Sequence, residues 1–392
     1  MAPEGVSFNL APMVRFVHRS YRLIGLCPYK LPPDINSNHF GVTMPTAIYS
    51  IVLATFSMAA LTFHAIRDAQ EILSRANLVN VSTKFMLAGG VGFHLFYILF
   101  TIYVRKSMWN FLREINNIDD KLRLLGVQFN YSRQYWFTQL FTGLWISFAG
   151  LLLLIHSYNN LHAFGSISTF FERIFSHFVA VGNYGAFMSE FFFCLLLIYT
   201  RFVCLNTAFR TQLLQHDAPK NVDMIVTHFR IVHDAITDAV GKRIIHISLF
   251  QAMTCISVTI ILAVLSISAL YKSLAFREDD TATTIAPHAW TVFFTILALV
   301  NVILASFLTS EGRSTSILVH KAMNRDILAG NIRHLRLFSQ QLRVRAPLVT
   351  CWLYNYDWEL IYTMCGTISM YTLIFIQFDI LAAEKQRTKY VP

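Results

Sequence analysis

Residues 289–309 read AWTVFFTILALVNVILASFLT, a stretch without a single charged side chain. A helix needs about 20 mostly apolar residues to cross the hydrocarbon core of a bilayer, so this stretch predicts a membrane-spanning helix. Six further stretches have the same apolar character, at residues 45–66, 85–104, 136–156, 177–200, 244–270 and 358–380. The sequence therefore predicts an all-α membrane protein with seven transmembrane helices.

The composition excludes a soluble protein. Of the 392 residues, 55% are hydrophobic and 14% are charged, whereas a water-facing domain carries about 25% charged residues. The net charge of +10 is explained by Lys and Arg gathered on one membrane face, so we expect no nucleic-acid partner. The six cysteines have no metal-binding spacing, and the motifs of hydrolases and metalloproteases are missing. We expect neither an enzyme nor a metal or cofactor site.

The basic residues predict the orientation of the chain. The segment before the first span and every second segment after it carry 23 Lys and Arg residues, and the alternate segments carry 9. Because basic residues near span ends stay in the cytosol, the amino terminus is predicted to be cytosolic and the carboxyl terminus extracellular. The acceptor sequence at Asn80 then falls in the first external loop, which makes Asn80 a candidate glycosylation site.

This topology divides the chain into five parts. Two basic internal segments, 205–243 and 310–347, carry apolar residues at helical spacing. Such helices either bundle beneath the membrane and join subunits, or lie on the inner leaflet, whose anionic lipids attract basic residues. The parts are a cytosolic amino-terminal segment, 1–44; transmembrane helices 1 to 6, 45–309, with the internal extension 205–243; an internal anchor helix, 310–347; the last transmembrane helix, 348–381; and an extracellular tail, 382–392.

The last span ends in a polar stripe. Residues 370–378 read MYTLIFIQF, and the amide of Gln377 must find hydrogen-bonding partners within the membrane. Such a stripe forms either a seam with a neighbouring helix or the wall of a water-filled lumen. The residues that precede Gln377 at intervals of three and four lie on the same face of the helix, and they are Ile374, Met370, Thr367 and Thr363.

This segment resembles the signature of the insect gustatory receptors, which is Thr-Tyr, five hydrophobic residues and Gln-Phe. Tyr371, Gln377 and Phe378 match it at the same spacing, and Met370 replaces its Thr. The resemblance implies a homotetrameric or heterotetrameric non-selective cation channel in the plasma membrane of chemosensory neurons. It also implies that a small-molecule tastant opens this channel.

The same resemblance assigns roles to the last helix. In that family the last helix of each subunit lines one central pore, so 348–381 would be the pore-lining segment here. Gln377 would lie at the constriction, with Phe378 and Tyr371 supporting it by packing. The rest of the pore lining would be Ile374, Met370, Thr367 and Thr363. Sugar-sensing members tend to carry an acid where this chain has Thr372, which favours a bitter or otherwise aversive tastant.

Aromatic and polar residues gather in the outer halves of spans two to six, and the tastant of that family binds in the outward-facing half of each subunit. Aromatic walls with a few polar groups suit a small organic ligand, although an interfacial aromatic belt would place several of the same residues there. Glu190, the one carboxylate in the interior of a span, either anchors a hydroxyl or amine of the ligand or holds the subunit together by a buried hydrogen bond, with a base such as His94 as one possible partner. The candidate ligand-binding residues are Phe93, His94, Tyr97, Trp145, His156, Tyr184, Glu190 and Trp290.

Two other receptor classes are alternatives. An odorant-receptor-type channel subunit shares the inverted topology, but its family lacks the Gln-Phe ending. A G-protein-coupled receptor has the opposite orientation, and the Asp-Arg-Tyr and Asn-Pro-x-x-Tyr motifs of that class are missing. A transporter would show Gly- or Pro-broken helices and repeated halves, and these spans show neither.

Overall fold

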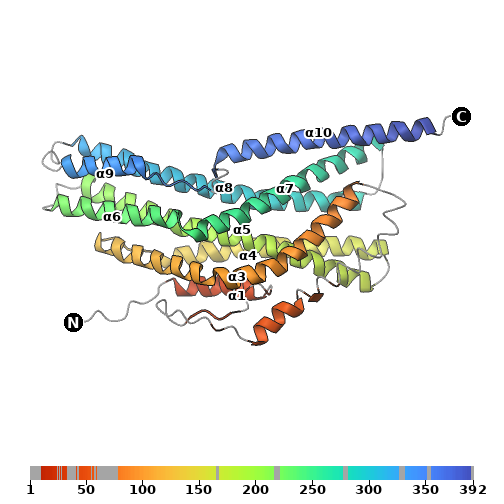
Figure 1. Ribbon diagram of the computed structural model, residues 1–392, viewed down its shortest axis with the longest axis horizontal. Coiled ribbons are helices and arrows are strands. Elements are labelled where there is room, and N and C mark those ends of the chain that lie inside the picture. Colours follow the sequence, from red (N-terminus) through yellow and green to blue (C-terminus); the bar gives the residue numbers. More distant parts are fainter. Residues whose placement is uncertain are drawn as a thin grey trace.

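Helices make up almost all of the described part of the protein (Figure 1). The computed structural model describes the backbone of residues 10–23, 25, 27, 29–32, 41, 44–53, 55–56, 59, 78–164, 167–215, 221–276, 281–325, 332–350 and 355–389. The side chains of 78–97, 155–181, 268–290, 382–389 and a few single positions lie outside this description. The helices are α1 (Ala11–Leu23), a short helix Met44–Leu53, α3 (Leu78–Leu124), α4 (Tyr131–Phe164), α5 (Ile167–Phe209), the π-helix η1 (Arg210–Gln215), α6 (Val222–Val240), α7 (Arg243–Phe276), α8 (Thr281–Met323), α9 (Ile332–Val344) and α10 (Trp358–Lys389).

Three of these helices are much longer than a bilayer is thick. α3 has 47 residues, and α5 and α8 have 43 each; at a rise of about 1.5 Å per residue they are about 65 to 70 Å long. The hydrocarbon core takes only about 30 Å of such a helix. Each therefore crosses a membrane and continues beyond it. Within the described residues, the stretches long and apolar enough to span are Tyr184–Leu214, Ile245–Val264, Thr291–Met323 and Trp358–Phe378.

The long helices form an elongated bundle. Figure 1 shows α6 and α9 beside the ends of α3, α5 and α8, at what we call the α6–α9 end. α10 begins near the middle of the bundle and runs to the opposite end. α5 is the central element, since it packs against α3, α4, α6, α7 and α8.

A buried ion pair joins α3 to α5. The side chains of Asp119 and Arg201 are both completely shielded from solvent. Arg201 Nε donates to Asp119 Oδ1 at 2.8 Å, and Nη2 donates to Oδ2 at 2.7 Å, which is the strong two-bond geometry of a guanidinium and a carboxylate. Arg201 Nη1 also donates to Gln134 Oε1 of α4 at 3.2 Å, and the Tyr131 hydroxyl donates to Asp119 Oδ2 at 3.0 Å. One ion pair thereby ties together three helices.

A second polar network joins α5 to α8. Asn206 Nδ2 donates to Glu311 Oε1 at 2.9 Å, and the Thr315 hydroxyl donates to Asn206 Oδ1 at 2.7 Å. Asn206 is 1% exposed and Thr315 is fully buried. The Nδ2 and Oδ1 atoms of Asn206 therefore both have hydrogen-bond partners, as a buried side-chain amide requires.

The α6–α9 end has an aromatic core around His233. Its ring meets Phe202 of α5 at a centroid distance of 5.5 Å and Phe338 of α9 at 5.8 Å. Phe209 of α5 packs on Phe229 of α6 at 5.0 Å. Burial lowers the pKa of His233 to about 4, so the imidazole is neutral at physiological pH.

Substituting one partner of the buried ion pair should destabilise the protein strongly. Asp119→Asn leaves the Arg201 charge buried without compensation, and we expect a loss of about 3 to 5 kcal/mol of unfolding free energy. Thermal unfolding of the purified full-length protein in detergent measures this loss. The combined variant Asp119→Leu with Arg201→Met should be more stable than Asp119→Asn, because it buries no charge.

The neighbouring residue provides a matched control. Asp120 pairs with Arg123 at 3.0 Å, and about two fifths of each side chain is exposed. Asp120→Asn should change the unfolding free energy by less than about 1 kcal/mol. Equal effects of Asp119→Asn and Asp120→Asn would contradict the importance of the buried pair.

Acidification should destabilise the α6–α9 end through His233. Its folded pKa of about 4 lies below the unfolded value, so the unfolded state binds the proton first. The unfolding free energy therefore falls as the pH drops below about 6.5, by at most about 1.4 kcal/mol per pH unit, until about pH 4. His233→Phe should weaken this pH dependence in thermal unfolding, whereas His228→Phe, at a half-buried position of the same helix, should leave it unchanged. An unaltered dependence in His233→Phe would show that another group is responsible.

Candidate functional site

Aromatic side chains from three helices meet on one side of α5. We call Trp145 and Phe148 of α4, Tyr184 of α5, and Phe293 and Phe294 of α8 the aromatic cluster. The rings of Tyr184 and Phe294 lie 4.1 Å apart, and those of Phe148 and Phe293 stack at 5.2 Å. The ring centroids of Phe293 and Phe294 are 5.4 Å apart, so ring contacts connect Tyr184 with Phe148.

The Trp145 ring lies against the backbone of α5. A Cβ atom at Gly185 would overlap this ring, so the glycine makes the close approach possible. Trp145 is 4% exposed, and its indole Nε1 has no hydrogen-bond partner among the residues that the structure describes. Buried polar atoms are nearly always satisfied, so this N–H is a donor available to a bound molecule.

Hydrogen bonds connect the cluster to α7. The Tyr184 hydroxyl lies 2.6 Å from Thr259 Oγ1 and 3.3 Å from the Phe294 carbonyl oxygen, and because Thr259 uses its own proton on Cys255, Tyr184 is the donor of the 2.6 Å bond. The Thr259 hydroxyl donates to the Cys255 carbonyl one turn below, at 2.9 Å. Aromatic walls with a few such polar groups are the usual lining of a site for a small organic molecule.

The structure brings together two of the predicted ligand-binding residues, Trp145 and Tyr184. Thr259 and Phe294 were missed, because a threonine and a phenylalanine within an apolar span carry no signal that separates them from ordinary packing residues. The remaining predicted residues except Glu190 have side chains outside the described set. They are Phe93, His94, Tyr97, His156 and Trp290.

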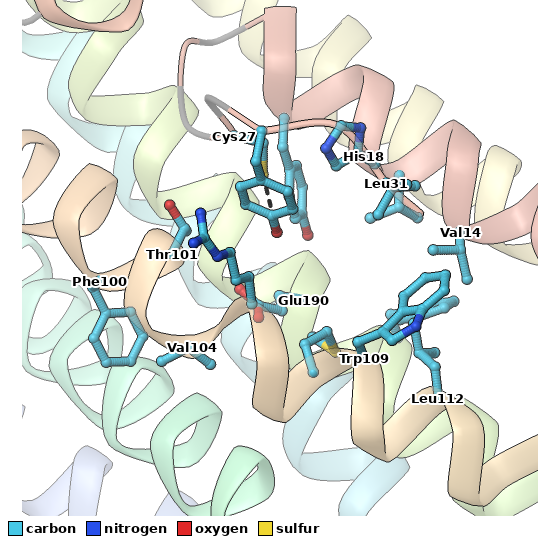
Figure 2. A pocket seen from close by; sticks show the side chains of 16 residues that line it. Val14, His18, Cys27, Leu31, Phe100, Thr101, Val104, Trp109, Leu112 and Glu190 are labelled. Carbon is cyan, nitrogen blue, oxygen red and sulfur yellow. Dashed lines mark hydrogen bonds between the residues drawn. The ribbon is translucent and has the colours of Figure 1, made fainter. Parts of the chain in front are cut away.

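Glu190 lies in a different place. It lines a cavity of about 70 Å³ between α1, residues 27–31, α3 and α5 (Figure 2). Figure 2 shows the Glu190 carboxylate on the same side of the cavity as Thr101 and Val104 of α3, with Cys27 and His18 across from it. Six residues separate Glu190 from Tyr184, which is a rotation of about 240° on a helix, so the two side chains leave α5 on different faces.

The groups from the amino-terminal segment are uncharged in this cavity. Burial raises the pKa of Tyr21 and Tyr29 well above the usual value, and burial together with the charge of Glu190 raises the pKa of Cys27 to about 12. Burial lowers the pKa of His18 to about 4. The Tyr21 hydroxyl donates to the Ala186 carbonyl at 2.9 Å, one turn from Glu190. The arrangement holds the amino-terminal segment on α5.

α10 packs on α7 and α8 along one narrow face and is exposed over most of its surface. Leu360, Met364 and Thr372 are 6%, 7% and 7% exposed and form its inner face. Met370, Tyr371 and Phe378 are 62%, 49% and 63% exposed. The other predicted pore residues are exposed or half-buried, and these are Thr363, Thr367, Ile374 and Gln377.

The two threonines of the predicted stripe need no external partner. The Thr363 hydroxyl donates to the Glu359 carbonyl at 2.9 Å, and the Thr367 hydroxyl donates to the Thr363 carbonyl at 2.7 Å. The side chain of Asn80 lies outside the described set. Within the part of the chain that the structure describes, no group of His, Cys, Asp and Glu could hold a metal ion.

The chain matches known proteins in two ways. The family model described as 7tm chemosensory receptor matches residues 14–382. The structure resembles that of the insect olfactory receptor OR5 from Machilis hrabei, with a TM-score of 0.69 and 10% sequence identity, covering 94% of this chain and 98% of that one. The same receptor in complex with eugenol gives a TM-score of 0.64 and 13% identity, with the same coverage.

No curated protein sequence matches the chain. The family match extends over nearly the whole length, and the structural likeness is that of the complete fold. The chain is therefore a seven-helix membrane protein that belongs to the 7tm chemosensory receptor family.

Proposed function

We propose that this protein is a subunit of a ligand-gated, non-selective cation channel of the gustatory-receptor type. The observation that carries the proposal is the exposure of α10. Of the apolar stretch Trp358–Phe378 only 17% is buried, against 67% of Tyr184–Leu214 and 50% of Thr291–Met323. This apolar helix packs on α7 and α8 and leaves most of its surface for lipid or neighbouring subunits to cover.

Identical subunits around one axis provide these neighbours. The stripe that ends at Gln377 carries an amide and two threonines, which suit a wet lumen, and the exposed Tyr371 and Phe378 provide apolar surface for a neighbouring α10. A tetramer, formed by copies of this chain or with related chains, would place four such helices around a pore. Lipid would cover the outward faces.

The taste assignment rests on residues Tyr371, Gln377 and Phe378, which carry the gustatory signature. An odorant-receptor-type subunit is the second candidate, because the structure resembles an insect olfactory receptor. That receptor is described in complex with eugenol, and the aromatic cluster here has the surface and donors to bind a small organic molecule of similar character. We propose the aromatic cluster as part of the tastant site.

The basic α6–α9 end would face the cytosol, and the carboxyl-terminal tail would lie outside the cell. The plasma membrane of a chemosensory neuron is the expected location. For Glu190 we favour the structural role, in which it holds the amino-terminal segment on α5, over direct contact with the tastant.

Substitution of Gln377 should alter ion permeation. In cells that express the full chain, Gln377→Ala should change the basal leak or the relative permeability of Na⁺, K⁺ and Ca²⁺, because it removes the polar ring at the constriction. Whole-cell current recording measures both. Leu373→Ala, at a 61% exposed position off the stripe, should conduct as the wild type does. Unchanged permeability in Gln377→Ala would contradict the pore assignment.

Removal of the Tyr184 hydroxyl should weaken the response to a tastant. A panel of sugars, bitter compounds and small aromatics such as eugenol is tested first on the wild type by current recording. For each compound that activates it, Tyr184→Phe should raise the half-maximal concentration about 3- to 10-fold, the worth of one hydrogen bond. Tyr199→Phe, on the same helix, is the control. Equal responses of both variants would exclude Tyr184 from the site.

Glycosylation tags at the two termini test the orientation. An acceptor sequence appended after residue 392 should gain a glycan, and one placed before residue 1 should not, because only external segments are modified. A mobility shift after deglycosidase treatment measures this. The opposite pattern would contradict the proposed topology.

A further inference from the structure

A second cavity, of about 290 Å³, lies between α8 and the start of α10. The apolar stretch 289–309 of α8 ends directly before Ser310, and the apolar stretch Trp358–Phe378 of α10 begins directly after Asp357. Ser310, Asp357 and Trp358 all line the cavity, and Figure 1 shows α10 beginning beside α8 near the middle of the bundle. Because a membrane-spanning stretch ends where the hydrocarbon core ends, this cavity lies at the level of the lipid headgroups.

The lining of this cavity carries charges of opposite sign that are not paired with each other. Arg313 comes from α8, whereas Asp357 and Glu359 come from the start of α10. Within the part of the chain that the structure describes, neither Arg313 nor Glu359 forms an ion pair. Glu311, two residues before Arg313, is instead bonded to Asn206 of α5 at 2.9 Å. A molecule that carries both a negative and a positive group can therefore pair with both sets of charges.

Hydroxyl groups in the same lining lack partners. Ser306 and Tyr356 line the cavity, and their hydroxyl oxygens are shielded from solvent without a hydrogen-bond partner among the described residues. A shielded hydroxyl without a partner is unfavourable, and it gains free energy when a bound acceptor reaches it. Thr309 and Ser310 add two further hydroxyl groups to the lining. The cavity is therefore suited to a polar group with several acceptor oxygens, such as a phosphate.

The size of the cavity fits a headgroup and not a whole lipid. Its volume equals that of about ten water molecules at about 30 Å³ each. A phosphate joined to an ethanolamine has fewer non-hydrogen atoms than that, and the acyl chains of the lipid would remain outside in the bilayer. Trp358, in the lining and 50% exposed, is a residue type that is enriched at the membrane–water interface.

The balance of charges selects among the headgroups. The lining has one arginine against two carboxylates, so it disfavours a purely anionic headgroup, which binds instead to basic pockets. An arginine pairs with a phosphate through two parallel hydrogen bonds. A primary ammonium donates three hydrogen bonds that carboxylates accept, whereas the quaternary ammonium of choline has no N–H to donate.

We propose that the cavity between α8 and the start of α10 binds the headgroup of phosphatidylethanolamine, a zwitterionic phospholipid with a primary ammonium group. Arg313 holds the phosphate, and Glu359 and Asp357 accept hydrogen bonds from the ammonium. The Glu359 backbone N–H donates to Asp357 Oδ1 at 3.0 Å, which fixes the Asp357 carboxylate at the start of α10. The bound lipid then bridges α8 and α10. This site shares no residue with the aromatic cluster, and the inference goes beyond the proposed channel function.

Thermal unfolding of the purified full-length protein in detergent tests the site. Short-chain phosphatidylethanolamine, phosphatidylcholine and phosphatidylglycerol are titrated separately, and the rise of the midpoint temperature gives an apparent dissociation constant for each. We expect phosphatidylethanolamine to bind at least about fivefold more tightly than the other two, because it alone combines a phosphate with three N–H donors. Free phosphoethanolamine and inorganic phosphate should bind at least about tenfold more weakly than the lipid, because they bury no acyl chain.

Four substitutions assign the binding to this cavity. Arg313→Gln, at an exposed position, should weaken phosphatidylethanolamine binding at least about fivefold. Glu359→Gln should remove most of the preference over phosphatidylcholine, because a partner of the ammonium is lost. Ser310→Trp fills the cavity without changing its charge and should abolish the preference. Arg343→Gln, at an exposed arginine of α9 outside the cavity, should leave all affinities unchanged.

Several results would overturn the inference. They are equal binding of the three lipids, a preference for phosphatidylglycerol, and unchanged binding in Arg313→Gln when that variant unfolds at the wild-type midpoint without lipid. Free phosphoethanolamine that binds as tightly as the lipid would also overturn it, because the site would then take a soluble molecule.

Current recording separates this inference from the channel proposal. A protein with the expected lipid preference that passes no current would contradict the channel and leave the headgroup site in place. A conducting protein without the lipid preference would contradict only the headgroup site.

Discussion

The ion pair of Asp119 with Arg201 is the constraint on which the arrangement of the bundle depends. Removing two charges from water is costly, and the attraction between them offsets that cost only when the geometry is good and the remaining polar atoms are satisfied. Both conditions are met here, because the pair is joined by two hydrogen bonds and receives further bonds from Gln134 and Tyr131. These bonds link α3, α4 and α5 at one buried point of the bundle, and a shift of any of the three helices would break at least one of them.

α5 carries this constraint to the rest of the molecule. From the α6–α9 end outward it presents Asn206 to α8, Arg201 to α3, Phe191 to the α10 connection and Tyr184 to the aromatic cluster. The face that bears Glu190 holds the amino-terminal segment. One helix therefore contacts both the candidate ligand site and the connection before α10, where Phe191 packs on Tyr356.

The contrast between the rigid framework and α10 suits a gated channel. The framework is held by buried polar networks and aromatic packing, whereas α10 has one narrow inner face, at Leu360, Met364 and Thr372. If α10 lines the pore as we propose, its packing on α7 and α8 leaves it with fewer contacts to break than the framework helices have. The same narrow contact leaves its other faces free to meet neighbouring subunits.

The sequence by itself determined the class of fold and most spans, because the length and hydropathy of a membrane helix are local properties of the chain. It also pointed to the last helix through a short motif, and to Trp145 and Tyr184 as members of a site. Only the tertiary structure decided the pairing of Asp119 with Arg201, the separation of Glu190 from Tyr184, and the packing of Tyr356 on Phe191. These depend on which faces of distant helices meet, and side-chain contacts between residues 80 or more positions apart leave no periodic trace in one sequence.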